Sequence, residues 1–161
     1  MRGLVRTLLT VKRSRMHGMA AITTTALIAV GCGASSYTRR DFIARADAIC
    51  ASALRQTRSI APGTALSAYL SAFVPVLQSE ESQLRALRRP PGTAQDRAIL
   101  AQYFAALAQT VAEYRRLAAA VKNGNEQRVT DAEAALGSSP VYSLATSYGL
   151  SSCGTPGSTA V

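Results

Sequence analysis

Side chains that carry most enzyme chemistry are scarce in this chain. Its 161 residues include no tryptophan and one histidine, His17, which lies within the first 31 residues. Residues 32–161 therefore have no imidazole, which excludes His-based catalytic triads, His-containing metal sites and His proton shuttles from that part. The chain also lacks a Cys-x-x-Cys pair, a phosphate-binding glycine loop and an Asp-rich calcium loop. We predict no cofactor and no metal site.

Acidic residues are few, with nine in all and none before Asp41. Paired carboxylates can act as general acid and base, so they are the remaining enzymatic option. Glu80 and Glu81 are adjacent and would point in different directions on a helix, while the acids between 126 and 133 (Glu126, Asp131 and Glu133) are typical of a solvated face. The sequence predicts no catalytic residue and no enzyme. A carboxylate-based hydrolase is the remote alternative.

The N-terminal apolar run is too short for a membrane span. Residues 16–30 are about as long as a signal-peptide core, whereas a span needs roughly 20 apolar residues. The run closes on Gly31 and Cys32, and five basic residues with no acid precede it (Arg2, Arg6, Lys12, Arg13 and Arg15). This layout predicts a lipoprotein signal peptide over 1–31, with lipid attached to Cys32. Ordinary secretion and a retained anchor are the alternatives.

The leader predicts where the protein resides. A lipid on Cys32 would hold the chain on the extracytoplasmic face of the cell membrane, because the diacylglyceryl group of a lipoprotein supplies the two acyl chains that stable anchoring needs. A start at Met16 would discard all five basic residues of the leader, which favours an upstream start.

Cysteine is present at three positions, an awkward number for an exported protein. Lipidation of Cys32 would leave Cys50 and Cys153 as an even pair in an oxidising compartment, where we predict a disulfide between them. Such a bond would close a loop of nearly the whole mature chain and restrict the unfolded state by roughly 4 to 5 kcal/mol. Two buried free thiols are the alternative, and a metal site would need further ligands.

Helical periodicity is clear in the first and third predicted helices. Thr38 with Asp41, and Thr93 with Asp96, have the spacing of capping boxes. The first helix runs to about residue 60 and carries an apolar stripe of Phe42, Ala46, Ile49, Cys50, Ala53 and Thr57. The stripe of the third helix is Leu100, Tyr103, Phe104, Leu107, Val111, Tyr114, Ala118 and Val121, and the helix ends near Gly124.

The second and fourth helices contain interruptions. Thr64 can cap the second helix, and Pro75 inside it predicts a kink near 71–74. The fourth begins at Asn125 and is broken around 137–140, so it is either bent or split in two. It ends at Gly149, a C-cap glycine followed by an apolar residue.

These elements predict an all-α fold, an antiparallel four-helix bundle with one disulfide. No segment alternates convincingly enough to be a strand. We expect a tether at 32–37, one domain at 38–153 and a disordered tail at 154–161. Because Cys50 lies about three turns into the first helix, the chain after Tyr148 would have to fold back along that helix to reach it.

Both cysteine-bearing ends of the domain resemble a group of small exported lipoproteins of actinobacteria. The resemblance rests on residues 41–43 (Asp-Phe-Ile), 46–50 (Ala-Asp-Ala-Ile-Cys), Pro90-Pro91 and 148–154, where Tyr-Gly-Leu is followed by Cys-Gly. It implies an all-helical domain with one disulfide joining its ends. It implies no activity, since no catalytic or binding residues are carried over with it.

Some residues could serve binding. Asp47, beside the first apolar stripe, is either an interaction group or a structural partner of a neighbouring helix. The later tyrosines (Tyr69, Tyr103, Tyr114, Tyr142 and Tyr148) could line a haem or small-molecule pocket, but at helical spacing they are more typical of a core with hydroxyls at its rim.

Arginines occur as scattered pairs, without the aromatic interleaving of a nucleic-acid surface. The pairs are Arg39-Arg40, Arg88-Arg89 and Arg115-Arg116. An exported protein also meets little nucleic acid, so we predict none as a partner. Contact with anionic lipid head groups or wall polymers is favoured, above all for Arg39-Arg40, which lie within a short tether of Cys32.

The sequence is best interpreted as a lipid-anchored binding or interaction module. Its predicted partners are the membrane, through Cys32, and an envelope protein or polymer. A carrier that holds a small apolar ligand between kinked second and fourth helices, beside Pro75 and Gly137, is the alternative. Nothing in the sequence sets an oligomeric state.

Overall fold

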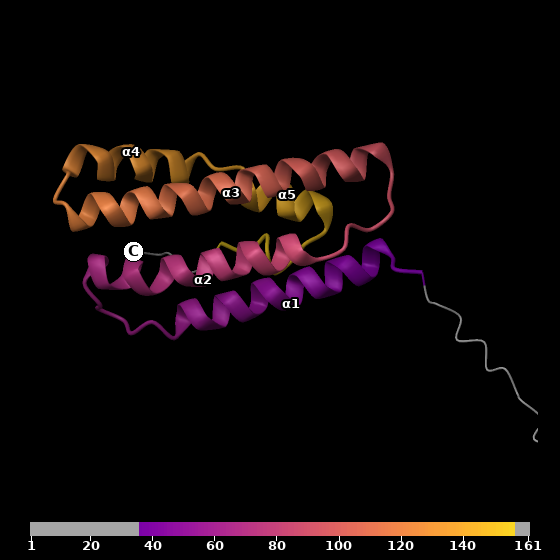
Figure 1. The fold of residues 1–161 in the computed structure, drawn as a ribbon, viewed down its shortest axis with the longest axis horizontal. Coiled ribbons are helices and arrows are strands. Elements are labelled where there is room, and N and C mark those ends of the chain that lie inside the picture. The colour runs from indigo at the N-terminus through magenta and orange to yellow at the C-terminus, as the bar shows by residue number, and fades with distance from the viewer. Residues whose placement is uncertain (1–35, 157–161) are drawn as a thin grey trace, which may run out of the picture. The chain divides into compact units, whose positions relative to one another are not determined.

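The computed structural model describes residues 36–156, whose regular secondary structure is entirely helical. The elements are α1 (Arg39–Arg58), α2 (Leu66–Ala86), α3 (Ala94–Lys122), α4 (Glu126–Gly137) and α5 (Val141–Tyr148) (Figure 1). The predicted leader, Cys32, and the tail after residue 156 lie outside the described residues.

Three helices, α1, α3 and α4, start where the capping pattern predicts them. The Thr38 hydroxyl accepts a hydrogen bond from the Asp41 N–H, and the Asp41 carboxylate accepts one from the Thr38 N–H; Thr93 and Asp96 repeat this exchange at α3. These hydrogen bonds lower the pKa of both carboxyls. At α4, the Asn125 side chain accepts from the Arg128 N–H. α1, α3 and α4 therefore each begin on a side chain that satisfies a free backbone donor.

The predicted cap of α2 is wrong. Ala65 is the N-cap and makes no side-chain hydrogen bond, because the Thr64 hydroxyl donates instead to the Ala61 carbonyl at 2.5 Å, within the preceding turn. The helix then continues through Pro75, which is exposed.

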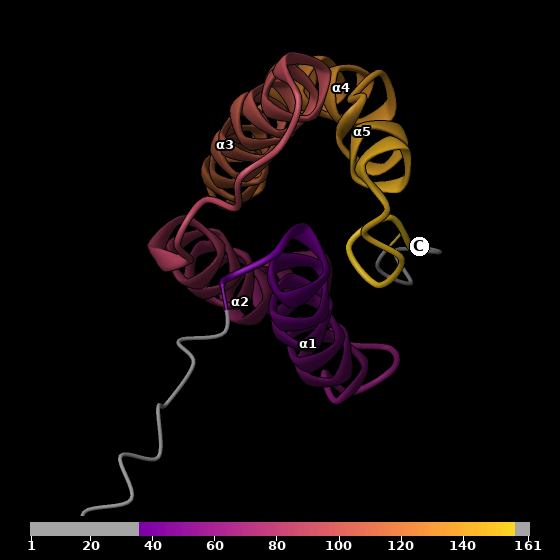
Figure 2. The same ribbon diagram turned by 90° about the vertical axis from the view of Figure 1, so that its right-hand side faces the viewer.

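An antiparallel four-helix bundle is confirmed, with its fourth helix split. α1 packs on α2, α2 on α3, and both α4 and α5 on α3, so α4 and α5 together run back along α3 (Figure 1). Viewed from its end, the arrangement is curved, and the chain after α5 returns toward α1 (Figure 2). Gly149 makes this turn in the left-handed region (φ 96°), and Leu150 after it is fully buried.

The core has a larger and a smaller part. The larger part surrounds Cys50 and Cys153 and includes Phe42, Leu84, Tyr103 and Tyr148. The smaller part consists of Leu70, Leu117 and Ala132, with partly buried neighbours. No helix among residues 36–156 is both long and apolar enough to cross a membrane.

The buried face of α3 is wider than its predicted stripe. Leu117 and Ala120 are buried in the last turns, whereas the predicted Ala118 and Val121 are only partly buried. Since α3 packs against α2 on one side and α4 on the other, a single stripe cannot describe its burial.

Candidate functional site

The predicted disulfide is present between Cys50 of α1 and Cys153, which follows α5. The sulfur atoms are 2.02 Å apart and both residues are buried. The chain after Tyr148 folds back along α1, as the position of Cys50 required. The interpretation as two free thiols is therefore wrong.

Asp47 fixes the returning segment to α1. Its carboxylate accepts hydrogen bonds from the Ser151 hydroxyl (2.8 Å), the Ser151 N–H (3.2 Å) and the Ser152 N–H (2.8 Å). On the same helix, Arg39 donates to the Tyr148 carbonyl at 2.5 Å. Asp47 is thus a structural partner, although it holds a loop and not a neighbouring helix.

The tyrosines belong mainly to the packed interior. Tyr103 and Tyr148 are almost fully buried, and the others singled out by the sequence are partly buried. The Tyr148 ring meets Phe42 edge-on at 5.8 Å between centroids, and Phe73 contacts both Tyr69 and Tyr114. Burial, and then the nearby charge of Glu80, raise the pKa of Tyr103. This packing agrees with the core interpretation.

Carboxylates are spread over the bundle. Glu81 pairs with Arg85 at 2.8 Å, and the three acids of α4 are exposed. Glu80 is half-buried, and burial raises its pKa to about 7. Residues 36–156 contain no cluster of three or more His, Cys, Asp or Glu side chains that could hold a metal ion.

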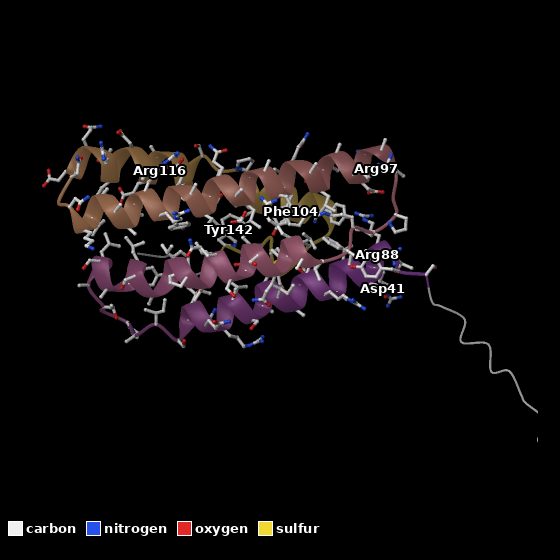
Figure 3. All side chains as sticks on the ribbon, viewed as in Figure 1. Asp41, Arg88, Arg97, Phe104, Arg116 and Tyr142 are labelled. Atoms are coloured by element: carbon white, nitrogen blue, oxygen red, sulfur yellow. A yellow bond between two sulfur atoms is a disulfide. The ribbon has the colours of Figure 1, made fainter. Side chains whose placement is uncertain are left out.

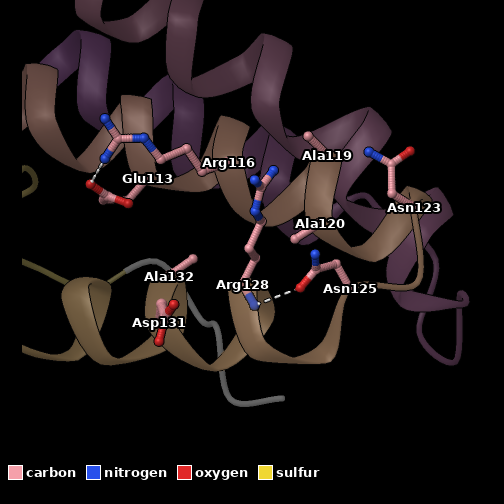
Figure 4. A pocket seen from close by; sticks show the side chains of 9 residues that line it. All are labelled: Glu113, Arg116, Ala119, Ala120, Asn123, Asn125, Arg128, Asp131 and Ala132. Carbon is pink, nitrogen blue, oxygen red and sulfur yellow. Dashed lines mark hydrogen bonds and ion pairs between the residues drawn. The ribbon is translucent and has the colours of Figure 1, made fainter.

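A hollow of about 450 Å³ lies between the end of α3 and the start of α4 (Figure 4). Ala119 and Ala120 of α3 and Ala132 of α4 form part of its wall, where side chains this small leave space between the helices. Charged and amide side chains complete the lining: Glu113, Arg116, Asn123, Asn125, Arg128 and Asp131. We call this the α3–α4 pocket.

Arg128 is the distinctive side chain of the α3–α4 pocket. The turn at Gly124 (φ 63°) and the Asn125 cap place Arg128 in the first turn of α4, and its side chain extends toward α3 (Figure 4). Within the described part of the chain, its guanidinium has no hydrogen bond or ion pair. Arg116, by contrast, pairs with the buried Glu113. The pocket therefore offers one uncommitted cation.

Glu113 was missed by sequence reasoning. It is only 7% exposed and lies on the α3 face that packs toward α4. The sequence does place Glu113 four residues before Leu117 and three before Arg116. At these spacings it shares a helix face with a buried residue and can form an ion pair with Arg116.

Arginines and aromatic rings gather at the opposite end of the bundle. Around the start of α1, the end of α2 and the start of α3 lie Arg39, Arg40, Arg45, Arg85, Arg88, Arg89 and Arg97, which we call the arginine end. Figure 3 labels Arg88 and Arg97 at this end. Arg39 lies over the Tyr148 ring (4.8 Å), Arg88 near Tyr37 (5.8 Å) and Arg89 over Phe104 (3.6 Å). The tertiary fold thus joins two arginine pairs that are far apart in sequence.

A second hollow, of about 280 Å³, opens within the arginine end. Arg89, Arg97, Phe104 and Tyr148 line it together with Pro90, Gly92, Asp96, Leu100 and Ala101. Neither hollow is lined by Pro75 or Gly137, where the apolar-carrier alternative would place its ligand.

Comparison of the chain with protein-family models, curated proteins and solved structures gave no match. The resemblance to actinobacterial lipoproteins stays a prediction.

Proposed function

We propose that this protein is a lipid-anchored, extracytoplasmic binding module whose α3–α4 pocket receives an anionic group of a ligand or an envelope partner. The uncommitted guanidinium of Arg128 over a hollow of about 450 Å³ carries the proposal. A guanidinium binds a carboxylate or phosphate through two parallel hydrogen bonds, and the Asn123 amide supplies further polar contacts. No chemical reaction is part of this function.

The arrangement of the helices supports this assignment. α1 begins beside the predicted tether, and the α3–α4 turn lies at the other end of the bundle (Figure 1). Since α1 has 20 residues, the two ends are separated by roughly 30 Å along the helix axis. An anchor at Cys32 would therefore leave the α3–α4 pocket facing away from the membrane.

Intact-mass analysis of the membrane fraction tests the anchor. We expect a mature chain beginning at Cys32 with added acyl mass, and a two-dalton increase when the disulfide is reduced. A soluble chain cleaved elsewhere, or an unprocessed one, would contradict the proposed anchoring.

Titration with simple anions tests the α3–α4 pocket. Inorganic phosphate and acetate, added to the purified full chain in detergent, should shift the amide resonances of Asn125 and Arg128. Substitution of Arg128→Gln should weaken phosphate binding about tenfold, because a charge-assisted hydrogen bond is lost.

Arg55→Gln is the matched control, since Arg55 is an exposed arginine on α1. It should bind phosphate like the natural chain. Equal binding by the Arg128→Gln variant would reject the pocket as the anion site.

A further inference from the structure

We propose that the arginine end is a membrane-facing surface that binds the phosphate groups of anionic phospholipids, with Arg89 at its centre. The inference rests on the proposed anchoring through Cys32, but its physical basis is separate: the charge, stacking and position of these arginines.

Positive charge at this end is incompletely neutralised. Its acids are already engaged, since Asp41 and Asp96 close the capping boxes and Glu81 pairs with Arg85. Within residues 36–156 the guanidinium groups of Arg40, Arg88 and Arg89 have no ion pair or hydrogen bond. Arg45, whose guanidinium lies 5.3 Å from the centre of the Tyr37 ring, likewise has none among these residues, so four cations are free to bind an external anion.

Arg89 is held in place for such an anion. Its guanidinium lies 3.6 Å from the centre of the Phe104 ring and lines the hollow between Pro90 and Tyr148. Arg85 also lies against Phe104, at 5.6 Å, and donates to the Phe104 carbonyl at 3.1 Å. Burial and the like charge of Arg85 lower the pKa of Arg89. A phosphate here would relieve this repulsion and accept hydrogen bonds from a guanidinium already oriented by stacking.

The length of the tether selects a lipid as the source of the phosphate. Only six residues, 33–38, separate Cys32 from Arg39. Fully extended, they reach roughly 25 Å, and any slack brings α1 closer to the lipid. Anionic head groups attract basic residues only within about a Debye length, near 8 Å at physiological ionic strength. Of the two ends of the bundle, the arginine end is the one that this tether can bring within a Debye length of the lipid head groups.

Arginine modification on vesicles tests the inference. The acylated full chain is inserted into phosphatidylcholine vesicles, with or without about one third phosphatidylglycerol, and treated with phenylglyoxal. Peptide mass spectrometry then gives the reaction rate at each arginine. We expect Arg88 and Arg89 to react about fivefold more slowly on the anionic vesicles, and high salt to abolish this protection. Arg128, at the other end of the bundle, should react equally on both and is the internal control.

Equal rates at Arg88 and Arg89 on the two vesicles would overturn the proposal, as would equal protection of Arg128. Inorganic phosphate added to phosphatidylcholine vesicles distinguishes the source: if it gives the same protection, the site binds free phosphate and the lipid surface is rejected. Arg97, which lines the same hollow as Arg89, should be protected with it. In an R88Q/R89Q variant the protection of Arg97 should disappear, whereas R55Q/R58Q, which changes two exposed arginines in the last turn of α1, should keep it. Retention in R88Q/R89Q would also reject the proposal.

A flotation experiment tests the acyl anchor separately from the arginine end. An acylated chain floats with phosphatidylcholine vesicles, whereas a chain without lipid does not. If the chain proves to be unacylated, salt-sensitive protection by added anionic vesicles would still support the arginine surface, and its absence would overturn it.

Discussion

Replacing Cys50 and Cys153 together by alanine should lower the free energy of unfolding by about 4 kcal/mol. The bond closes a loop with a sequence separation of 103 residues, so its removal frees nearly the whole domain in the unfolded state. It also joins α1 to the segment after α5, a helix that packs mainly on α3 and meets α1 through Tyr148. Denaturant unfolding of the natural chain with and without reductant, and of the double variant, measures the effect.

The Asp47→Asn substitution measures how much the hydrogen bonds beside the disulfide contribute to the free energy of unfolding, apart from the disulfide itself. The amide has one acceptor oxygen where the carboxylate uses two, so either the Ser151 or the Ser152 donors would lose their acceptor along with the negative charge, at a cost of about 1 to 2 kcal/mol. Glu133→Gln, an exposed α4 substitution, should have no effect.

A loss of stability below about 1 kcal/mol for the double cysteine variant would contradict the disulfide prediction. It would mean that Asp47 and the buried Leu150 hold the returning segment without the disulfide.

Glu80→Gln should stabilise the domain by about 2 kcal/mol at pH 8 and by only about 0.5 kcal/mol at pH 5. Burial raises the pKa of Glu80 to about 7, above its ordinary value of 4.5. Between these values the folded state keeps a proton that the unfolded state has lost, so the stability contributed by the neutral carboxyl falls as the pH rises. Each pKa unit corresponds to about 1.4 kcal/mol, and the remaining hydration of a half-buried side chain reduces the total.

Denaturant unfolding at pH 5, 6, 7 and 8 checks this prediction. The difference between Glu80→Gln and the natural chain should grow up to about pH 7 and then level off. Glu133→Gln is again the control, because Glu133 is an exposed glutamate on α4. A difference that does not change with pH would show that Glu80 is fully hydrated in the folded protein.

The two ends of the bundle suit different contacts. At the arginine end, Arg89 is stacked on Phe104. At the other end, Arg128 is uncommitted above the α3–α4 pocket. We propose that the first meets the membrane and the second a ligand, and the vesicle and phosphate experiments examine each end independently.

Local signals were sufficient for the helices. The Thr38–Asp41 and Thr93–Asp96 boxes mark helix starts because they act over three residues of chain. Thr64 failed as a cap for the same local reason, since its hydroxyl had a nearer acceptor in the preceding turn. Glu113 was not recognised because its burial depends on α4 packing against α3, which no periodicity within α3 contains.

The sequence by itself determined the helical class, the interruption of the fourth helix and the candidate pairing of Cys50 with Cys153, because periodicity, helix breakers and cysteine number are properties of the chain alone. The structure then showed that the fourth helix is split and that the disulfide is present. Only the tertiary structure decided what surrounds each charge. It partly buries Glu80, lets Asp47 accept hydrogen bonds from the backbone of the returning segment, and brings Arg39 and Arg89 to one end of the bundle. Electrostatic energies depend on the distance between charges and on their access to solvent. Both are set by contacts between helices that lie many residues apart in the sequence.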